Sequence, residues 1–207
     1  MQAHAPERPS RLPVALSAFV GRRGELDAVR AALDNARAVS LVGPGGSGKT
    51  RLATELAHDL DDRDPGGVTW VDLAPLTNPA TVPRAVANAL DVREAPGQPL
   101  LDSVIAHLGN EPHLIVLDNC EHLLPDCAEL AQRLLHECRQ LRILATSREV
   151  LGVDGEVVWQ VPPLSTPAAG DVTAAALRAA ESAQLFAARA QVVRPGFAID
   201  DRNAASI

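Results

Sequence analysis

The sequence of 207 residues is poor in aromatic side chains, with two Trp, three Phe and no Tyr. Proteins that bind single-stranded nucleic acid without sequence preference stack its bases on such side chains, so the composition argues against this class. Basic residues are outnumbered by acidic ones, and a formal net charge of -7 does not suit a chain that coats nucleic acid by itself. We therefore expect no direct contact between this chain and nucleic acid.

Long apolar runs and leader-like segments are also missing. No run reaches the roughly 18 apolar residues of a membrane-spanning helix, and no basic segment followed by an apolar stretch opens the chain. The three cysteines are an odd number without the spacing of a metal site, which is typical of reduced thiols. These features predict a cytoplasmic protein without a membrane partner.

Apolar runs of strand length alternate with segments of helical periodicity along most of the chain. This alternation predicts an α/β fold, with a parallel sheet covered by helices on both faces. The predicted strands are 38–42, 68–73, 114–117, 141–148 and 157–161. The predicted helical segments are 26–33, 52–60, 82–90, 101–108 and 123–138.

Lysine is the rarest charged residue, since eighteen of the nineteen basic residues are arginine. The single lysine, Lys49, lies in a segment, 43–50, that matches G-x-x-x-x-G-K-[ST] in full between a predicted strand and a predicted helix. We expect Lys49 to contact the β- and γ-phosphates of a nucleotide and the Thr50 hydroxyl to hold Mg²⁺. Four glycines allow backbone angles that are closed to other residues and let the N–H groups of the loop point inward: Gly43, Gly45, Gly46 and Gly48.

Candidate site residues also stand at or near the carboxyl ends of two other predicted strands. Asp118 is a candidate ligand of Mg²⁺ through water, or a residue that caps the next helix. Arg148 could reach a γ-phosphate, or it could be a solvated residue of a turn. Glu121 could polarise the attacking water, or it could be a first-turn acid favoured by the helix dipole. The residues alone leave these alternatives open.

The segment 120–138 contains three cysteines and two histidines, which suggests a zinc site at first sight. Its apolar residues fall on one face of a helix, and Cys127 and Cys138 belong to that face. His122 and His136 fall off it. We therefore expect buried thiols that pack as small apolar side chains instead of zinc ligands.

Four motifs, in this order, resemble the STAND signal-transduction ATPases. They are Phe-Val-Gly-Arg at 19–22 with Glu-Leu at 25–26, the loop 43–50, the segment 116–122 and the segment 145–149. Within that class they are similar to the NB-ARC-like ATPases of large bacterial transcriptional regulators of the LuxR and antibiotic-regulatory types. The resemblance covers residues 17–197. It implies a three-layer P-loop NTPase core whose five-stranded parallel sheet places the strand before the loop next to the strand before Arg148.

The resemblance also implies a domain organisation and an activity. Residues 1–16 would be a linker, 17–165 the nucleotide-binding domain, and 166–207 a linker with the beginning of a truncated helical domain. The expected function is an ATP/ADP-binding switch with slow, Mg²⁺-dependent hydrolysis, acting with the neighbouring domains of a parent regulator and able to form a nucleotide-dependent oligomer. Because the family continues with further domains, we expect an excised module.

The motifs and the resemblance together give the expected site. Lys49, Glu121 and Arg148 would be the catalytic set, with Arg148 as the sensor of the terminal phosphate. Thr50 and Asp118 would hold the metal. The nucleotide-binding residues would be Val20, Gly21, Arg22, Gly43, Pro44, Gly45, Gly46, Ser47, Gly48, Lys49, Thr50, Arg51 and Pro163.

The sequence departs from the family pattern at Asn119, where a second acid often follows the metal-binding aspartate. An amide cannot act as a base, so hydrolysis would be slow or would depend on Glu121. Two main alternatives stay open, beside a ring-forming remodelling ATPase whose arginine finger cannot be picked out of eighteen arginines by sequence. One is a stand-alone P-loop enzyme such as a small-molecule kinase, which would consume nucleotide faster in the presence of its acceptor. The other is a nucleotide-binding interaction module that binds without turnover.

Overall fold

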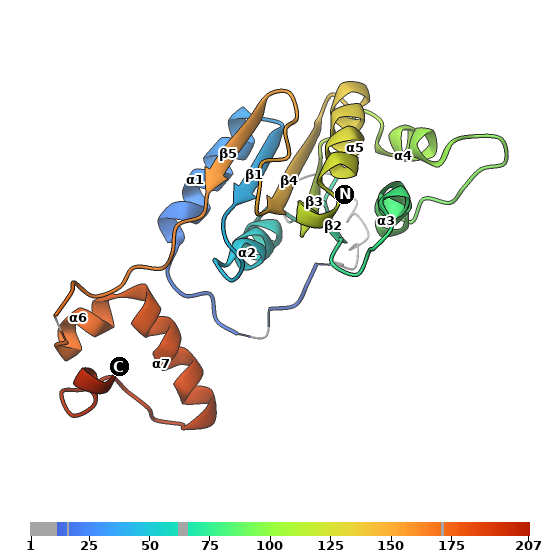
Figure 1. Ribbon diagram of the computed structural model, residues 1–207. Coiled ribbons are helices and arrows are strands. Elements are labelled where there is room, and N and C mark those ends of the chain that lie inside the picture. The colour runs from blue at the N-terminus through green and yellow to red at the C-terminus, as the bar shows by residue number, and fades with distance from the viewer. Residues whose placement is uncertain (1–11, 16, 62–65, 171) are drawn as a thin grey trace, which may run out of the picture.

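An open parallel β-sheet, covered by helices on both faces, is followed by a short helical segment (Figure 1). The computed structural model describes residues 12–15, 17–61, 66–170 and 172–207. The strands are β1 (Ala38–Val42), β2 (Val68–Asp72), β3 (His113–Asp118), β4 (Leu141–Ser147) and β5 (Glu156–Gln160). The helices are α1 (Arg23–Asn35), α2 (Lys49–Asp61), α3 (Val82–Ala89), α4 (Leu100–Leu108), α5 (Leu124–Glu137), α6 (Ala174–Ala179) and α7 (Glu181–Val193). Three short 3-10 turns are η1 (Pro79–Thr81), η2 (Cys120–His122) and η3 (Ala204–Ser206).

The sheet has the strand order β2-β3-β4-β1-β5, and every neighbouring pair is parallel. The five predicted strands are confirmed to within one residue at each end. Strand β1, which leads into the loop 43–50, pairs with β4, as the resemblance implied. In a parallel sheet the carboxyl ends of all strands meet at one edge, and open α/β sheets bind their ligands there.

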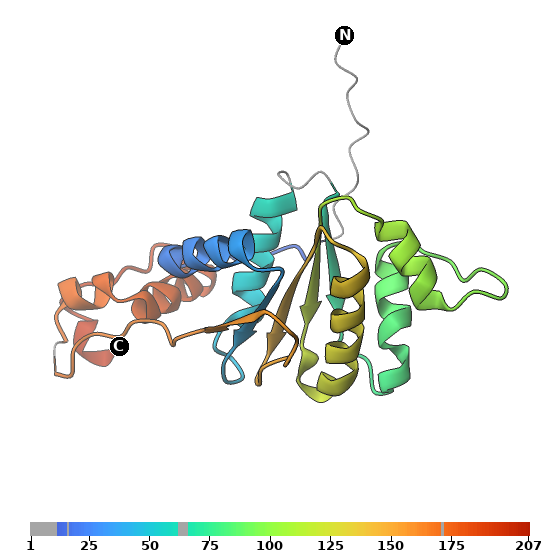
Figure 2. The same cartoon turned by 90° about the horizontal axis from the view of Figure 1, so that it is seen from above.

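The core consists of two apolar clusters, one on each face of the sheet. Successive residues of the central strands point to opposite faces, so Leu114 and Val116 join one cluster while Ile115 and Leu117 join the other. Helices α1 and α2 cover the first face, and α3, α4 and α5 cover the second (Figure 2). Burial on both faces explains why these strands appear in the sequence as continuous apolar runs.

The three cysteines are buried, as predicted. Cys127 and Cys138 pack with the cluster under α5, and Cys120 is buried beside them in η2. Burial raises the pKa of the Cys138 thiol. The ring nitrogen Nε2 of His122 lies 2.9 Å from the carbonyl oxygen of Leu76. This histidine therefore links η2 to the segment after β2.

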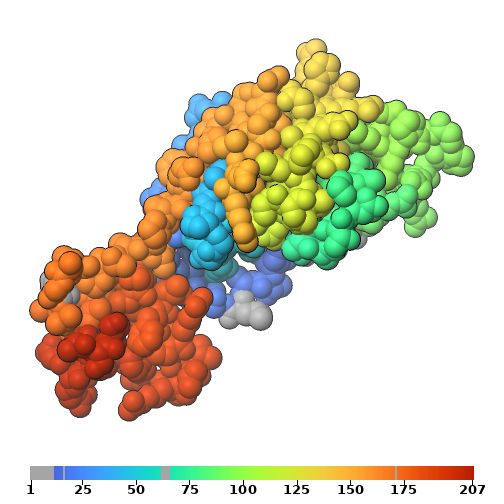
Figure 3. Space-filling model, in the orientation of Figure 1, coloured from blue at the N-terminus to red at the C-terminus, as the bar shows by residue number. Residues whose placement is uncertain are grey.

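Helices α6 and α7 belong to a smaller helical segment with its own apolar cluster. Its buried residues include Leu177 and Ile199, and the rings of Phe186 and Phe197 meet edge to face at 5.8 Å. In the space-filling view this segment forms a lobe beside the sheet domain (Figure 3). The division near residue 165 stays a prediction, and most of the expected linker 1–16 lies outside the described residues. None of the helices in the described ranges has the length and apolar character needed to cross a membrane.

Candidate functional site

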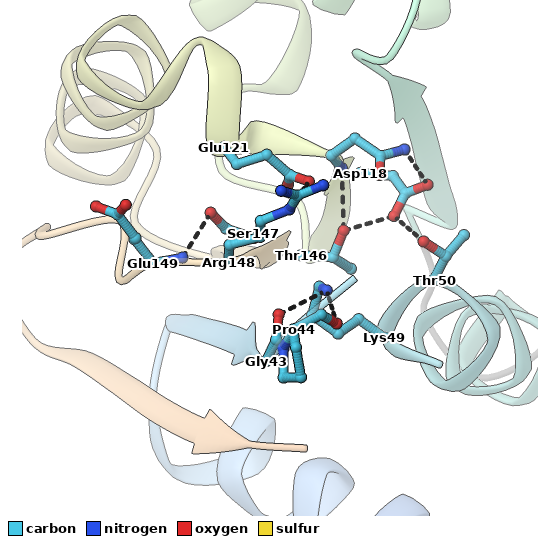
Figure 4. A network of polar contacts seen from close by, with 11 residues as sticks. Gly43, Pro44, Lys49, Thr50, Asp118, Glu121, Thr146, Ser147, Arg148 and Glu149 are labelled. Carbon is cyan, nitrogen blue, oxygen red and sulfur yellow. Dashed lines mark hydrogen bonds and ion pairs between the residues drawn. The ribbon is translucent and has the colours of Figure 1, made fainter. Parts of the chain in front are cut away.

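The loop 43–50 connects the end of β1 to the start of α2, as its sequence predicts. Lys49 is the first residue of α2, and its side chain is buried. Its ammonium group donates to the carbonyl oxygens of Gly43 at 2.8 Å and Pro44 at 3.1 Å (Figure 4). The charge of Lys49 is therefore held against the backbone of the loop, at the position where phosphates bind in this type of loop.

Two of the four loop glycines use the backbone freedom that the sequence allows them. Gly46 and Gly48 adopt positive φ angles of 78° and 90°, but Gly43 and Gly45 do not. Space is the requirement at Gly43, because a Cβ there would lie 2.9 Å from the Ser47 hydroxyl oxygen. A Cβ at Gly48 would lie 2.9 Å from Nη1 of Arg22. Glycine at these two positions thus lets the Ser47 and Arg22 side chains lie directly against the backbone of the loop.

Asp118 stands at the carboxyl end of β3, where three side chains donate hydrogen bonds to it. The hydroxyls of Thr50 and Thr146 both reach Oδ1, at 2.9 Å and 2.5 Å, and the amide of Asn119 reaches Oδ2 at 3.1 Å (Figure 4). The backbone N–H of Asn119 donates in turn to the Thr146 hydroxyl at 3.0 Å. The structure thus brings together the two predicted metal ligands, Thr50 and Asp118.

Burial raises the pKa of Asp118, and the hydrogen bonds from Thr146 and Thr50 partly oppose that effect. The neighbouring charges of Asp72 and Glu121 raise the pKa further. A divalent cation would offset this concentration of negative charge, and the available ligands are the oxygens that Mg²⁺ prefers. Within the described residues no three acidic, histidine or cysteine side chains form a metal site of their own. Phosphate and water oxygens would have to complete the coordination shell, as they commonly do for Mg²⁺.

Glu121 and Arg148 form an ion pair with each other, with Nε 3.3 Å from Oε1 (Figure 4). The Arg148 side chain is largely exposed, whereas Oε2 of Glu121 is buried and has no hydrogen-bond partner in the described part of the chain. Both residues line a cavity of about 580 Å³ together with Lys49 and Thr50. The candidate base, Glu121, and the candidate sensor, Arg148, therefore lie together beside the loop, where the ion pair engages both side chains.

A second cavity, of about 650 Å³, shares Gly45, Gly46 and Gly48 of the loop with the first and has a mostly apolar lining. Arg22 forms part of its wall and is buried, and its Nη2 donates to the carbonyl oxygen of Pro162 at 2.7 Å. The predicted binding residues that line this cavity are Val20, Arg22, Pro44, Gly45, Gly46, Ser47, Gly48, Arg51 and Pro163. Gly21 does not line it, and faces Glu181 instead.

Several residues that shape the site were not assigned from the sequence. Ser182, Leu185 and Arg189 of α7 complete the wall of the second cavity. Nothing in the sequence shows that a helix more than 130 residues from the loop returns to it. The sequence shows Thr146 only at the end of a predicted strand, and its contact with Asp118 depends on the pairing of β3 with β4.

Comparison with known proteins identifies a family for the central part of the chain. The family described as an AAA domain matches residues 31–153, which is more than half of the chain. The matched range contains the phosphate loop, Asp118, Glu121 and Arg148.

Two relatives from Mycobacterium tuberculosis are much longer than this chain. The protein named "Putative HTH-type transcriptional regulator Rv0890c" is 44% identical over 179 residues, which are 86% of this chain and 19% of that protein. The protein named "Uncharacterized protein Rv0894" is 38% identical over 192 residues, which are 93% of this chain and 46% of that protein. The chain thus spans about a fifth of the first relative and somewhat under half of the second.

Solved structures share the fold. Cdc6p from Pyrobaculum aerophilum superimposes with a TM-score of 0.60 at 18% identity, and the match covers 89% of this chain and 52% of that one. At this level of identity the likeness concerns the fold alone, and it agrees with the P-loop NTPase architecture predicted from the sequence.

Proposed function

Because this chain belongs to the AAA domain family of P-loop ATPases, we propose that it is an ATP/ADP-binding switch module of a bacterial transcriptional regulator. One observation carries this proposal. The buried ammonium of Lys49 and the Thr50–Asp118 hydrogen bond lie at one phosphate-binding loop, next to a cavity with an apolar lining. This arrangement suits a ligand with a phosphate chain and an apolar base. The motifs shared with STAND ATPases favour adenine as that base.

The roles of the residues follow from their positions. Lys49 and the backbone N–H groups of the loop would bind the β- and γ-phosphates, and the Thr50 hydroxyl and Asp118 would hold Mg²⁺, the latter through water. Bound Mg²⁺ supplies charge neutralisation at the phosphates. Arg148, exposed and beside the loop, would move toward a terminal phosphate because a phosphate carries more negative charge than its present partner, Glu121.

Hydrolysis has less structural support than binding. Asn119 cannot take a proton. Among the residues that line the cavity of about 580 Å³, Glu121 is the acid closest to Asn119 in the sequence. As long as Glu121 is paired with Arg148, one of its two carboxylate oxygens is engaged and the other is buried. We therefore propose slow turnover, which rises only when Arg148 is drawn away by a terminal phosphate.

The ion pair between Glu121 and Arg148 also favours a second candidate, a nucleotide-binding interaction module without turnover. In that case the pair would persist in the ATP-bound form. We rank a small-molecule kinase below these two, because it would need an acceptor site with a base of its own.

Regulation of transcription rests on the relatives. The chain is 44% identical to a section of a protein whose name describes it as an HTH-type regulator. We propose that residues 17–165 bind the nucleotide and that 166–207 begin a helical domain. The bound nucleotide would then set the arrangement of neighbouring domains in a cytoplasmic parent protein, with or without a change of oligomeric state.

Titration of the purified chain with ATP and ADP by calorimetry, with and without Mg²⁺, tests the proposal when phosphate release is followed in the same samples. Micromolar binding with slow release supports the switch module. Binding with no release at all supports the interaction module. The absence of binding to either nucleotide would overturn both.

A further inference from the structure

Glu181, the first residue of α7, joins three segments that are far apart in the sequence. Its Oε1 accepts a hydrogen bond from the backbone N–H of Arg22 at 2.8 Å. Its Oε2 accepts one from the backbone N–H of Ser165 at 3.3 Å. In the reverse direction, the backbone N–H of Glu181 donates to the Ser165 hydroxyl at 3.0 Å. One side chain thus fastens the start of α7 to the entry of α1 and to the segment after β5.

The surroundings of Glu181 are shaped for this contact. Gly21 has a positive φ of 68°, and a Cβ at this position would collide with the Glu181 carboxylate. The backbone N–H of Ser182 adds a bond to the carbonyl oxygen of Ser165 at 3.0 Å. Hydrogen bonds from the Arg22 and Ser165 backbones lower the pKa of Glu181, so its carboxylate is ionised at neutral pH.

Only a carboxylate satisfies both backbone donors at once. The two oxygens of Glu181 face one N–H group each. A glutamine of the same shape offers one oxygen and one NH₂ group, so its second position would set a donor against a donor. The contact therefore depends on the charge and the two acceptors, and not on the length of the side chain alone.

The Glu181 contacts connect the two segments that form opposite walls of the second cavity. Val20 and Arg22 belong to one wall, and Ser182 and Leu185 of α7 belong to the other. Arg22 also extends to the loop, where its guanidinium lies against Gly48 and donates to the carbonyl oxygen of Pro162. A continuous series of contacts thus runs from the phosphate loop through Arg22 and Glu181 to α7.

Building on the proposed function, we propose that Glu181 is a positioning residue that couples nucleotide in the cavity to the docking of α7. A nucleotide that touches both walls favours the placement in which the walls are close, and the Glu181 contacts favour the same placement. By linkage, each stabilises the other. Loss of the Glu181 contacts lowers the population of the competent placement, and the apparent affinity falls in proportion.

The first part of the test is nucleotide affinity. ADP and ATP are titrated by calorimetry into the wild-type chain, Glu181→Gln and the control Glu129→Gln, which makes the same change in α5, away from the cavity. Glu181→Gln should bind about tenfold more weakly, the effect of one lost hydrogen bond to a charged group. Glu129→Gln should bind as the wild type does. Ser165→Ala removes the hydroxyl that accepts from the backbone N–H of Glu181, keeps both backbone donors to the carboxylate, and should weaken binding roughly fivefold.

The second part is amide hydrogen exchange measured by NMR. The backbone amides of Arg22 and Ser165 should exchange faster in Glu181→Gln than in the wild type, and ADP should slow them in the wild type. Amides of β4 serve as the internal control and should exchange at the same rate in both proteins, which separates loss of the contact from general unfolding.

The outcomes separate the two claims. If the wild type binds no nucleotide, both the proposed function and the coupling are overturned. If the wild type binds and Glu181→Gln binds equally well, the coupling alone is overturned. Unchanged exchange at Arg22 and Ser165 in Glu181→Gln would show that the carboxylate does not hold these segments. This result, measured without nucleotide, would by itself overturn the inference.

Discussion

The hydroxyl of Thr146 supports the buried charge of Asp118, and its removal has a consequence that can be calculated. Thr146 is fully buried at the end of β4. It donates to Oδ1 of Asp118 at 2.5 Å and accepts from the N–H of Asn119 at 3.0 Å. Thr146→Val keeps the shape of the side chain and removes both hydrogen bonds, so packing in the sheet is preserved.

Two losses contribute to the expected fall in stability. A hydrogen bond to a charged group is worth about 1.5–3 kcal/mol, and a backbone N–H left without a partner costs about 1–3 kcal/mol. Relaxation around the site reduces the sum, so we expect the variant to be destabilised by about 3 kcal/mol near neutral pH. Mg²⁺-dependent binding of ATP should weaken as well, because Asp118 loses a bond that fixes its orientation.

The dependence on pH gives the sign of the effect. Burial raises the pKa of Asp118, and the hydrogen bond from Thr146 lowers that pKa more than the bond from Thr50 does. Without the Thr146 bond the pKa of Asp118 in the folded state rises further above its unfolded value. An acid whose pKa is higher in the folded than in the unfolded state does not affect stability at a pH below its unfolded pKa. The free energy of unfolding then falls as the pH rises through the folded pKa. The deficit of the variant should therefore be largest at neutral pH and shrink toward about pH 4.

Urea unfolding followed by circular dichroism, from neutral pH downward, measures this deficit. Thr54→Val is the matched control, because the buried Thr54 hydroxyl donates to a neutral acceptor, the carbonyl oxygen of Thr50, at 2.8 Å. The control should lose about 1 kcal/mol at every pH. A Thr146→Val deficit that matches the control in size, or that does not change with pH, would refute the reasoning.

Three further variants test the remaining roles by calorimetry. Lys49→Ala should weaken ATP and ADP about 100-fold, because it removes the buried ammonium of the loop; unaltered affinity would exclude the phosphate-loop assignment. Asp118→Asn should reduce the affinity for ATP in the presence of Mg²⁺ to the value found without it, and a retained Mg²⁺ effect would place the metal ligand elsewhere. Arg148→Ala should weaken ATP about tenfold and leave ADP nearly unchanged; equal losses for the two nucleotides would remove its role as a sensor.

The sheet and the phosphate loop could be predicted from the sequence because their determinants are local. Continuous apolar runs mark strands that are buried on both faces, and the loop motif is a contiguous string of residues. Lys49 is the clearest case. In a chain that otherwise uses arginine, the loop keeps a compact ammonium that fits between the carbonyls of Gly43 and Pro44. An arginine fork would not enter the same space.

The contacts between distant segments could not be predicted in this way. The return of α7 to the loop depends on Arg22 and Gly21, two consecutive residues with positive φ, that meet Glu181. Arginine seldom adopts this conformation, so nothing local indicates it. The pairing of Glu121 with Arg148 likewise depends on the register of β3 against β4, which a motif search does not specify.

Two acids lie at or just after the carboxyl end of β3, and they differ in their environments. Asp118 is buried and receives hydroxyl and amide donors on both oxygens, which hold it in the orientation that the proposed metal ligand would need. Glu121 has one oxygen in an ion pair with an exposed arginine and the other buried without a partner in the described residues. A buried carboxylate oxygen without a donor is costly, so a water molecule placed there gains a strong acceptor. On the proposed function, a terminal phosphate that attracts Arg148 leaves Glu121 free to bind that water, and sensing of ATP and the start of its hydrolysis become one event.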